Sequence, residues 1–312
     1  MPKRFTYSGL YLLLRGTSVF RIMNIKNYFY YILLAGSAWV ACTERIDINT
    51  ETSPPRLVIY GYITTDTTQQ AISITRSTGY FDTAKPKGIS HATVSINSDG
   101  GDVFPLSEST ETPGLYLTSP DVYGIPGKTY TLHATLDFDG TGEMETYEST
   151  SYLPFPATLD AAMVGHSNIL SDYLQVLVWG ELPEESSGNF SFHLFRNGVA
   201  INDSLRGFRI MTDEYIVNKK FTAISIFQLN QKDDNEKLSI GDTIVVQVES
   251  LTSEYATFID NARTELRGPV PLFGGPPANI ETNIQSLSPN SKTGISGFFT
   301  AYSKSSTGMI YQ

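Results

Sequence analysis

The sequence contains one cysteine, Cys42, so no disulfide bond can form within the chain. A folded body of this length must therefore be stabilised by buried apolar area. Basic residues are also scarce, because 22 Lys and Arg stand against 32 Asp and Glu, for a net charge of −10. Nucleic acids require basic patches on the proteins that bind them, so this charge balance argues against nucleic acid as a partner.

Several enzyme motifs are missing from the sequence. It has no His-Glu-x-x-His zinc motif, no Gly-x-Ser-x-Gly nucleophile elbow, no Walker loop and no Rossmann glycine triplet. The four histidines are scattered, which favours ordinary surface histidines over a shared metal site. We therefore expect a protein without enzymatic activity and without a cofactor. The alternative is an enzyme whose carboxylates converge only in the folded chain.

The N-terminal apolar run is too short to span a membrane. It covers residues 28–40, which is 13 residues, whereas a spanning helix needs about 20, so the run fits the h-region of a signal peptide. Small residues precede Cys42, where bacteria attach lipid before cleavage, although Trp39 stands where such signals prefer Leu, Val or Ile. The alternative is an ordinary secretory signal followed by a chance cysteine.

The start of the signal is better placed at Met23 than at Met1. A start at Met23 leaves 19 residues before Cys42, with Lys26 as the positive n-region, whereas 41 residues from Met1 exceed the usual length of about 15–30. The sequence therefore predicts an upstream extension at 1–22, a lipoprotein signal peptide at 23–41 and a lipidated tether at 42–55. Without residues 1–42 the net charge becomes −15, with 17 Lys and Arg against 32 Asp and Glu. Such a body suits attachment to a membrane through the lipid and not through basic residues.

Beyond the tether, apolar and polar residues alternate with the period of β-strands. Turn clusters rich in Gly, Pro and Asp separate these segments, and Leu153-Pro154-Phe155-Pro156 interrupts them because proline cannot serve a central strand. The pattern predicts two immunoglobulin-like antiparallel β-sandwich domains, at 56–152 and 157–312. The expected strands are 57–63, 72–75, 92–96, 130–136, 173–179, 190–196, 223–229 and 243–250, with two closing strands at 297–302 and 308–311.

One segment, near 253–267, has the period of a short amphipathic helix. Tyr255, Ile259 and Leu266 are among the apolar residues that fall on one face, Ser253 can cap the N-terminus, and Gly268-Pro269 ends the helix. We expect this face to pack on a sheet. The alternative is a helix that binds a partner.

Aromatic residues in loops are the best candidates for ligand or partner contact, because binding residues concentrate on loops. These residues are Tyr123, Phe155 and Phe273. The alternative is that they cap the ends of the sandwiches. Trp179 falls in an apolar strand, where a role in the core is expected.

A weak calcium candidate lies at residues 137–143. Asp137, Asp139 and Glu143 bring carboxylates together around two glycines, but the segment lacks the EF-hand spacing and its flanking helices. Aspartate and glycine at the tip of a hairpin explain the segment more simply. We therefore expect no metal site.

Several segments in a fixed order resemble a known family. The segments are Cys42 to Asp47, Arg56 to Thr64, Ser73 to Ser77 with Tyr80-Phe81, Ala92 to Val94, Pro113 to Tyr116, Gly127 to Leu132, Pro276 to Ile280 and Gly297 to Ala301. Together they are similar to the Bacteroidota lipoproteins catalogued as domain of unknown function 4249, over nearly all of residues 42–312. This resemblance implies outer-membrane lipoproteins with immunoglobulin-like bodies that are suspected partners of TonB-dependent outer-membrane transporters, and it implies no catalytic residues.

The expected function follows from the lipid anchor, the tether, the β-sandwich body and the missing enzyme motifs. We expect an outer-membrane lipoprotein that serves as an accessory or binding module of a TonB-dependent transporter. The alternative is a structural or adhesive surface protein built from the same sandwiches.

Overall fold

The computed structural model describes residues 54–312, except 80–83, 202–203, 206–207, 268–279 and 290. The predicted extension, signal peptide, lipidation site Cys42 and most of the tether lie outside the described residues, as does Phe273. Within the described part of the chain, no helix combines the length and the hydropathy needed to cross a membrane.

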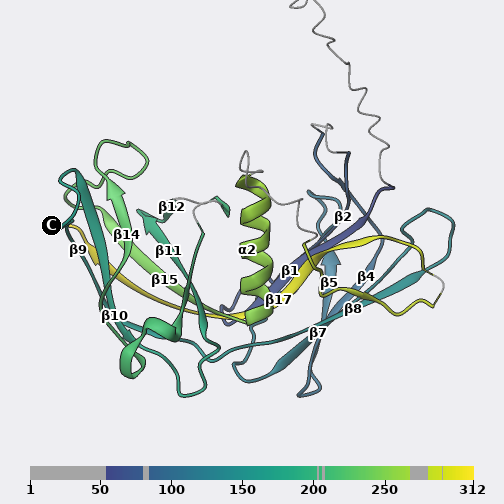
Figure 1. Ribbon diagram of the computed structural model, residues 1–312. Coiled ribbons are helices and arrows are strands. Elements are labelled where there is room, and N and C mark those ends of the chain that lie inside the picture. The colour runs from purple at the N-terminus through teal and green to yellow at the C-terminus, as the bar shows by residue number, and fades with distance from the viewer. Residues whose placement is uncertain (1–53, 80–83, 202–203, 206–207, 268–279, 290) are drawn as a thin grey trace, which may run out of the picture. The chain divides into compact units, whose positions relative to one another are not determined.

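The described chain is mainly β, with one α-helix, as the sequence predicts (Figure 1). The strands are β1 (Leu57–Thr64), β2 (Ala71–Arg76), β3 (Lys87–Gly88), β4 (Thr93–Ser98), β5 (Val103–Glu108), β6 (Leu115–Leu117), β7 (Thr129–Leu136), β8 (Glu145–Tyr152), β9 (Thr158–His166), β10 (Tyr173–Glu181), β11 (Asn189–Arg196), β12 (Val199–Ile201), β13 (Arg209–Thr212), β14 (Lys220–Asn230), β15 (Thr243–Leu251), β16 (Gln285–Ser286) and β17 (Ile295–Ile310). The helix is α2 (Ser253–Arg267), and two 3-10 turns, η2 (Asp213–Tyr215) and η3 (Val217–Lys219), precede β14.

The first lobe consists of β1 to β8, β16 and the N-terminal half of β17. β5 pairs with both β6 and β4, so that one continuous sheet folds over a single core. Strand β7 illustrates why the sequence folds this way, because every second residue from Tyr130 to Leu136 is buried. The predicted alternation of β7 is therefore confirmed. Ile59 and Ile74 from one side of this core meet Ile96 and Leu132 from the other.

The second lobe consists of β9 to β15 and the C-terminal half of β17. Strands β14, β10 and β9 form a separate three-stranded sheet, which packs on the sheet that contains β11 and β15. Val176 and Val178 of β10 are fully buried in this second core. Trp179 lies on the opposite face of β10 and is only partly buried, so its predicted role in the core is wrong.

The segment 153–156 connects the two hydrophobic cores. Leu153 is fully buried in the first core, and Ala157 is fully buried in the second. Strand β17 then connects the lobes, because Ile295–Tyr302 pairs in parallel with β1 and Ser303–Ile310 pairs antiparallel with β15. Figure 1 shows this strand running from one lobe to the other beneath α2.

Two closing strands were expected where the structure has the single strand β17. The polar run from Ser303 to Thr307 interrupts the apolar pattern, but its backbone still pairs with β15, and pairing does not require apolar side chains. Gly297 permits the close approach of β1. Its φ is +101°, and a Cβ atom there would lie 2.0 Å from the carbonyl oxygen of Ile59.

Helix α2 packs the Tyr255 and Ile259 part of its apolar face on β17, as predicted, but Leu266 of the same predicted face is 49% exposed. Tyr255 and Ile259 are buried against Phe298 and Tyr302. The cap differs from the prediction, because the Oγ1 atom of Thr252 accepts the backbone N–H of Tyr255 at 3.3 Å. Ser253 is instead the first helical residue, and it is exposed.

Candidate functional site

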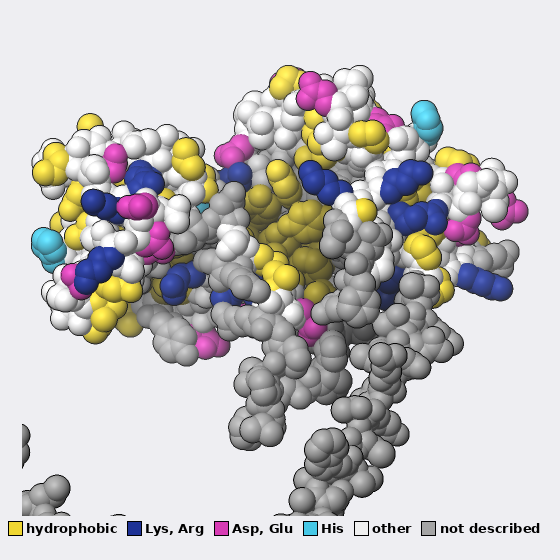
Figure 2. All heavy atoms as spheres, turned by 90° about the horizontal axis from the view of Figure 1, so that it is seen from above, with side chains coloured by type: hydrophobic (Ala, Val, Ile, Leu, Met, Phe, Trp, Pro, Cys, Tyr) yellow, Lys and Arg dark blue, Asp and Glu magenta, His cyan; other side chains and the backbone are white. Residues whose placement is uncertain are grey.

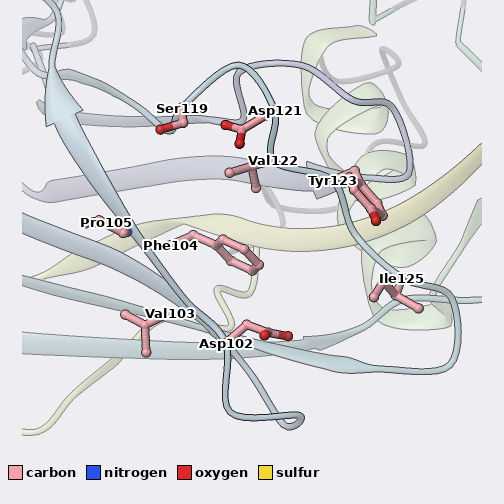
Figure 3. Close-up of a pocket in the computed structure, with 9 residues that line it drawn as sticks. All are labelled: Asp102, Val103, Phe104, Pro105, Ser119, Asp121, Val122, Tyr123 and Ile125. Atoms are coloured by element: carbon pink, nitrogen blue, oxygen red, sulfur yellow. The ribbon is translucent and has the colours of Figure 1, made fainter.

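A groove on the surface of the first lobe surrounds Tyr123, one of the aromatic residues that the sequence predicts for contact (Figure 3). It measures about 390 Å³. One wall is the start of β5, with Asp102, Val103 and Phe104. The other wall is the loop between β6 and β7, which contributes Asp121 and Tyr123, among other residues. In Figure 3 the Phe104 ring lies in the middle, between Asp102 and the loop that carries Tyr123.

Hydrogen bonds hold the loop of Tyr123 from both sides. The buried Gln70 donates through Nε2 to the carbonyl oxygen of Val122 at 3.0 Å. The N–H of Gly124 donates to the carbonyl oxygen of Thr64 at 2.7 Å. The N–H of Ile125 donates to the hydroxyl of Tyr130, also at 2.7 Å. The backbone around Tyr123 is therefore ordered before any partner arrives, which lowers the entropy cost of binding.

Three apolar side chains of the groove are exposed to solvent. Val103 is 61% exposed, Tyr123 50% and Ile125 42%. Neither the Tyr123 hydroxyl nor the Asp121 carboxylate makes a hydrogen bond or ion pair with any residue that the structure describes. These groups are therefore free to contact another molecule.

The second carboxylate of the groove is held in its charged form. The Oδ2 atom of Asp102 accepts a hydrogen bond from Ser98 Oγ at 2.9 Å and lies 3.3 Å from Lys128 Nζ. The hydrogen bond from Ser98, followed by the Lys128 ammonium, lowers the pKa of Asp102 below its usual value. At neutral pH this end of the groove consequently carries a carboxylate beside exposed apolar surface.

Phe155 lies apart from the groove. It is half-buried, and its ring packs over Gly127, where a Cβ atom would stand 3.0 Å from the ring. This position fits the alternative in which a loop aromatic covers the end of a sandwich. Of the two predicted contact residues that the structure describes, Tyr123 lines the groove and Phe155 does not, whereas Phe273 lies outside the described residues.

The weak calcium candidates lie in the turn between β7 and β8. The carboxylate of Asp137 accepts the backbone N–H groups of Gly140, Thr141 and Gly142 at 2.8, 3.2 and 2.8 Å. These bonds, led by the one from Gly142, lower the pKa of Asp137. Among the described residues, no group of three or more His, Cys, Asp or Glu side chains is arranged to hold a metal ion.

Ser191, His193 and Glu249 form a polar trio in the second lobe. His193 Nε2 lies 2.8 Å from Ser191 Oγ and 3.1 Å from Glu249 Oε2. In a catalytic triad the serine and the carboxylate contact different nitrogens of the histidine. Here both contact Nε2, and Ser191 is fully buried, so this trio cannot present an activated nucleophile to a substrate. It instead provides hydrogen bonds for the buried Glu249 carboxylate, which Gln247 also contacts at 3.0 Å.

Sequence reasoning missed the carboxylates of the groove. Asp121 lies in a turn two residues before Tyr123, so its nearness in the sequence to a predicted contact residue was a signal for it. Asp102 and Phe104 carried no such signal, because only the pairing of β5 with β4 and β6 brings them beside the loop.

Comparisons with known proteins place the chain in a family. No protein with a curated description matches it. Among solved structures, a β-glucuronidase from Parabacteroides merdae with glycerol in its active site is similar at 12% identity and a TM-score of 0.22, over 63% of this chain. The chain spans 23% of that enzyme's length, and a similarity this low carries no argument about function. The family described as Domain of unknown function (DUF4249) matches residues 43–308, and the chain belongs to this family.

Proposed function

We propose that this protein is a non-enzymatic binding module of the cell envelope, anchored by lipid at Cys42, which serves as an accessory to a TonB-dependent outer-membrane transporter. The Tyr123 groove is the surface through which it contacts that transporter. The observation that carries this proposal is the exposure of Val103 at the start of β5 and of Tyr123 and Ile125 on the hydrogen-bonded loop that forms the other wall.

The composition of the groove supports a protein partner. Tyrosine is enriched among the residues that dominate binding energy at protein interfaces, because its ring buries a large area with few rotatable bonds. The carboxylates of Asp102 and Asp121 flank this apolar surface. A partner loop with one apolar side chain and a nearby basic or hydroxyl group complements the groove.

The predicted lipid anchor agrees with a contact at the outer membrane. A lipidated Cys42 would hold the folded body beside the outer membrane, and the segment that follows it would let the groove reach a membrane-embedded neighbour. Thirteen residues, from 43 to 55, extend at most about 45 Å.

The proposal is tested by affinity capture from solubilised outer membranes with the tagged full-length protein. Tyr123→Ala removes the aromatic ring from the groove, and Met163→Ala is the matched control on β9 of the second lobe, where Met163 is 47% exposed. We expect the wild type and the control to capture a TonB-dependent transporter. Tyr123→Ala should lose about 2 kcal/mol of binding energy, which is roughly a 30-fold decrease in affinity. Equal capture by both variants would contradict the role of the groove.

Deletion of the protein separates the proposal from the adhesive alternative. An accessory of a transporter is needed for uptake of the transported nutrient, whereas an adhesive protein is needed for attachment of cells to a surface. Cells that lose attachment but keep normal uptake would support the adhesive function and contradict the proposal.

A further inference from the structure

A pocket of about 400 Å³ lies in the second lobe, away from the Tyr123 groove. Three strands and the helix contribute to its lining: Phe192 comes from β11, Arg209 from β13, Ser225 from β14 and Arg263 from α2. Figure 2 shows that, on one face of the molecule, Lys and Arg side chains are mixed with Asp and Glu side chains.

Arg263 has an unfilled hydrogen-bonding capacity in this pocket. Its side chain is only 17% exposed, and its Nε atom is buried without a hydrogen-bond partner among the described residues. Its ion-pair partner is Asp260, three residues earlier on the same helix, at 3.5 Å from Nη1. Asp260 is itself 70% exposed, so this contact neutralises the guanidinium poorly. A buried donor without an acceptor is costly, and a turn of the side chain that brought Nε to a ligand oxygen would remove this cost.

Arg209 brings a second guanidinium to the same pocket. It is exposed and makes no hydrogen bond or ion pair with the residues that the structure describes. Among the described residues that line the pocket, none is Asp or Glu. Two arginines thus share a described lining without a carboxylate, in a chain whose net charge is −10. Because like charges repel each other, an anion between the two arginines would stabilise both.

The remaining lining selects the kind of anion. Phe192 and Ile226 are 3% and 6% exposed, and Ile210 and Met211 add partly buried apolar surface. An inorganic ion would leave this surface without a partner, whereas an organic acid would cover it with its apolar body. Guanidinium groups bind carboxylates through two parallel hydrogen bonds, which is a geometry that an ammonium group cannot offer.

We infer that the pocket between β13 and α2 binds a small organic acid, whose carboxylate lies between Arg209 and Arg263 and whose apolar body rests on Phe192 and Ile226. This site is independent of the contact proposed for Tyr123, because it uses other residues in the other lobe. It gives the protein a small-molecule ligand in addition to its proposed protein partner.

The test measures binding by isothermal titration calorimetry to the full-length chain carrying Cys42→Ser, which removes the predicted lipid attachment. The probes are 3-phenylpropanoate, the neutral 3-phenyl-1-propanol, which keeps the same apolar body, and inorganic phosphate. We expect the acid to bind at least about tenfold more tightly than the alcohol, since hydrogen bonds to charged groups are the stronger ones. We also expect the acid to bind more tightly than phosphate, which lacks the apolar body.

Charge-removing variants locate the bound acid. Arg209→Gln and Arg263→Gln should each weaken binding of the acid at least about tenfold. Lys220→Gln removes a positive charge from β14, outside the pocket, and should change binding less than twofold. The exposed Arg209 side chain makes no hydrogen bond or ion pair with the described residues, so its variant reports on binding even if Arg263→Gln lowers the melting temperature.

Four results would overturn the inference. They are no binding of the acid up to millimolar concentration, equal binding of acid and alcohol, unchanged affinity in Arg209→Gln, and phosphate binding as tight as that of the organic acid.

Discussion

Removal of the Tyr255 ring should show how strongly α2 is fixed to β17. Tyr255 is 5% exposed, and its ring centroid lies 5.6 Å from that of Phe298 and 6.4 Å from that of Tyr302. Truncation of a buried aromatic residue to alanine costs about 3–5 kcal/mol, because the apolar area is lost and a cavity remains. We therefore expect Tyr255→Ala to lower the free energy of unfolding by about this amount.

A second variant separates packing from hydrogen bonding at the same position. Tyr255→Phe keeps the ring but removes the hydroxyl, which lies 2.8 Å from the hydroxyl of Tyr60. Burial raises the pKa of Tyr255, so this hydroxyl stays protonated at neutral pH and the hydrogen bond persists. Tyr60 is 36% exposed and can turn to water once its partner is gone. The loss should therefore be only about 0.5–1.5 kcal/mol.

Urea unfolding at pH 7, followed by circular dichroism, measures both variants against the full-length parent. Tyr123→Ala is the matched control, because the exposed Tyr123 ring makes no hydrogen bond with the described residues and its removal should change stability by less than about 0.5 kcal/mol. A loss below about 1 kcal/mol for Tyr255→Ala would refute the view that this ring holds α2 on β17.

Three further predictions concern other parts of the chain. Gly297→Ala should destabilise the fold by more than about 2 kcal/mol, because the added Cβ atom would lie 2.0 Å from the Ile59 carbonyl oxygen. Gly165→Ala should be neutral, because a Cβ atom added there would have no atom within 4 Å. Urea unfolding of the two variants measures the difference, and equal midpoints would contradict it. Cys42→Ser should abolish labelling by radioactive fatty acid, and a variant that is still labelled would exclude lipid attachment at Cys42. Stability should fall on acidification below about pH 4.5, because folding lowers the pKa of several carboxyl groups below the ordinary values of 3.8 for Asp and 4.5 for Glu. These carboxylates contribute fully to the free energy of unfolding at pH values above the ordinary pKa, and the contribution is lost as the pH falls and the folded protein binds protons. Urea midpoints at pH 7, 5 and 3.5 measure this loss, and a higher midpoint at pH 3.5 than at pH 5 would contradict it. These carboxylates are Asp102, Glu108, Asp137, Glu145, Glu184 and Asp242.

Strands with one buried face could be predicted from the sequence because their burial has period two. β7 and β10 follow this rule, and α2 follows the helical equivalent. β9 could not be predicted in the same way. Only Leu159 is buried among its residues. A β-bulge between Leu159 and Ala161 shifts the inward-facing positions to Ala162 and Val164, so the apolar residues of β9 do not keep one alternation.

The connection between the lobes was also beyond the sequence. The parallel pairing of β1 with β17 joins residues about 240 positions apart, and no local pattern records which distant strand a strand will choose. The same limit applies to the two-arginine pocket. Arg209 and Arg263 belong to different elements, and they come together only because α2 packs near β13.

Site-specific photocrosslinking in intact cells tests whether the Tyr123 groove contacts a TonB-dependent transporter. A photoreactive phenylalanine derivative is incorporated in place of Tyr123 and, in a separate strain, in place of the similarly exposed Met163. We expect an adduct with a TonB-dependent outer-membrane transporter at position 123 and none at position 163. Absence of that adduct at position 123, or equal adducts at both positions, would contradict the proposed role of the groove.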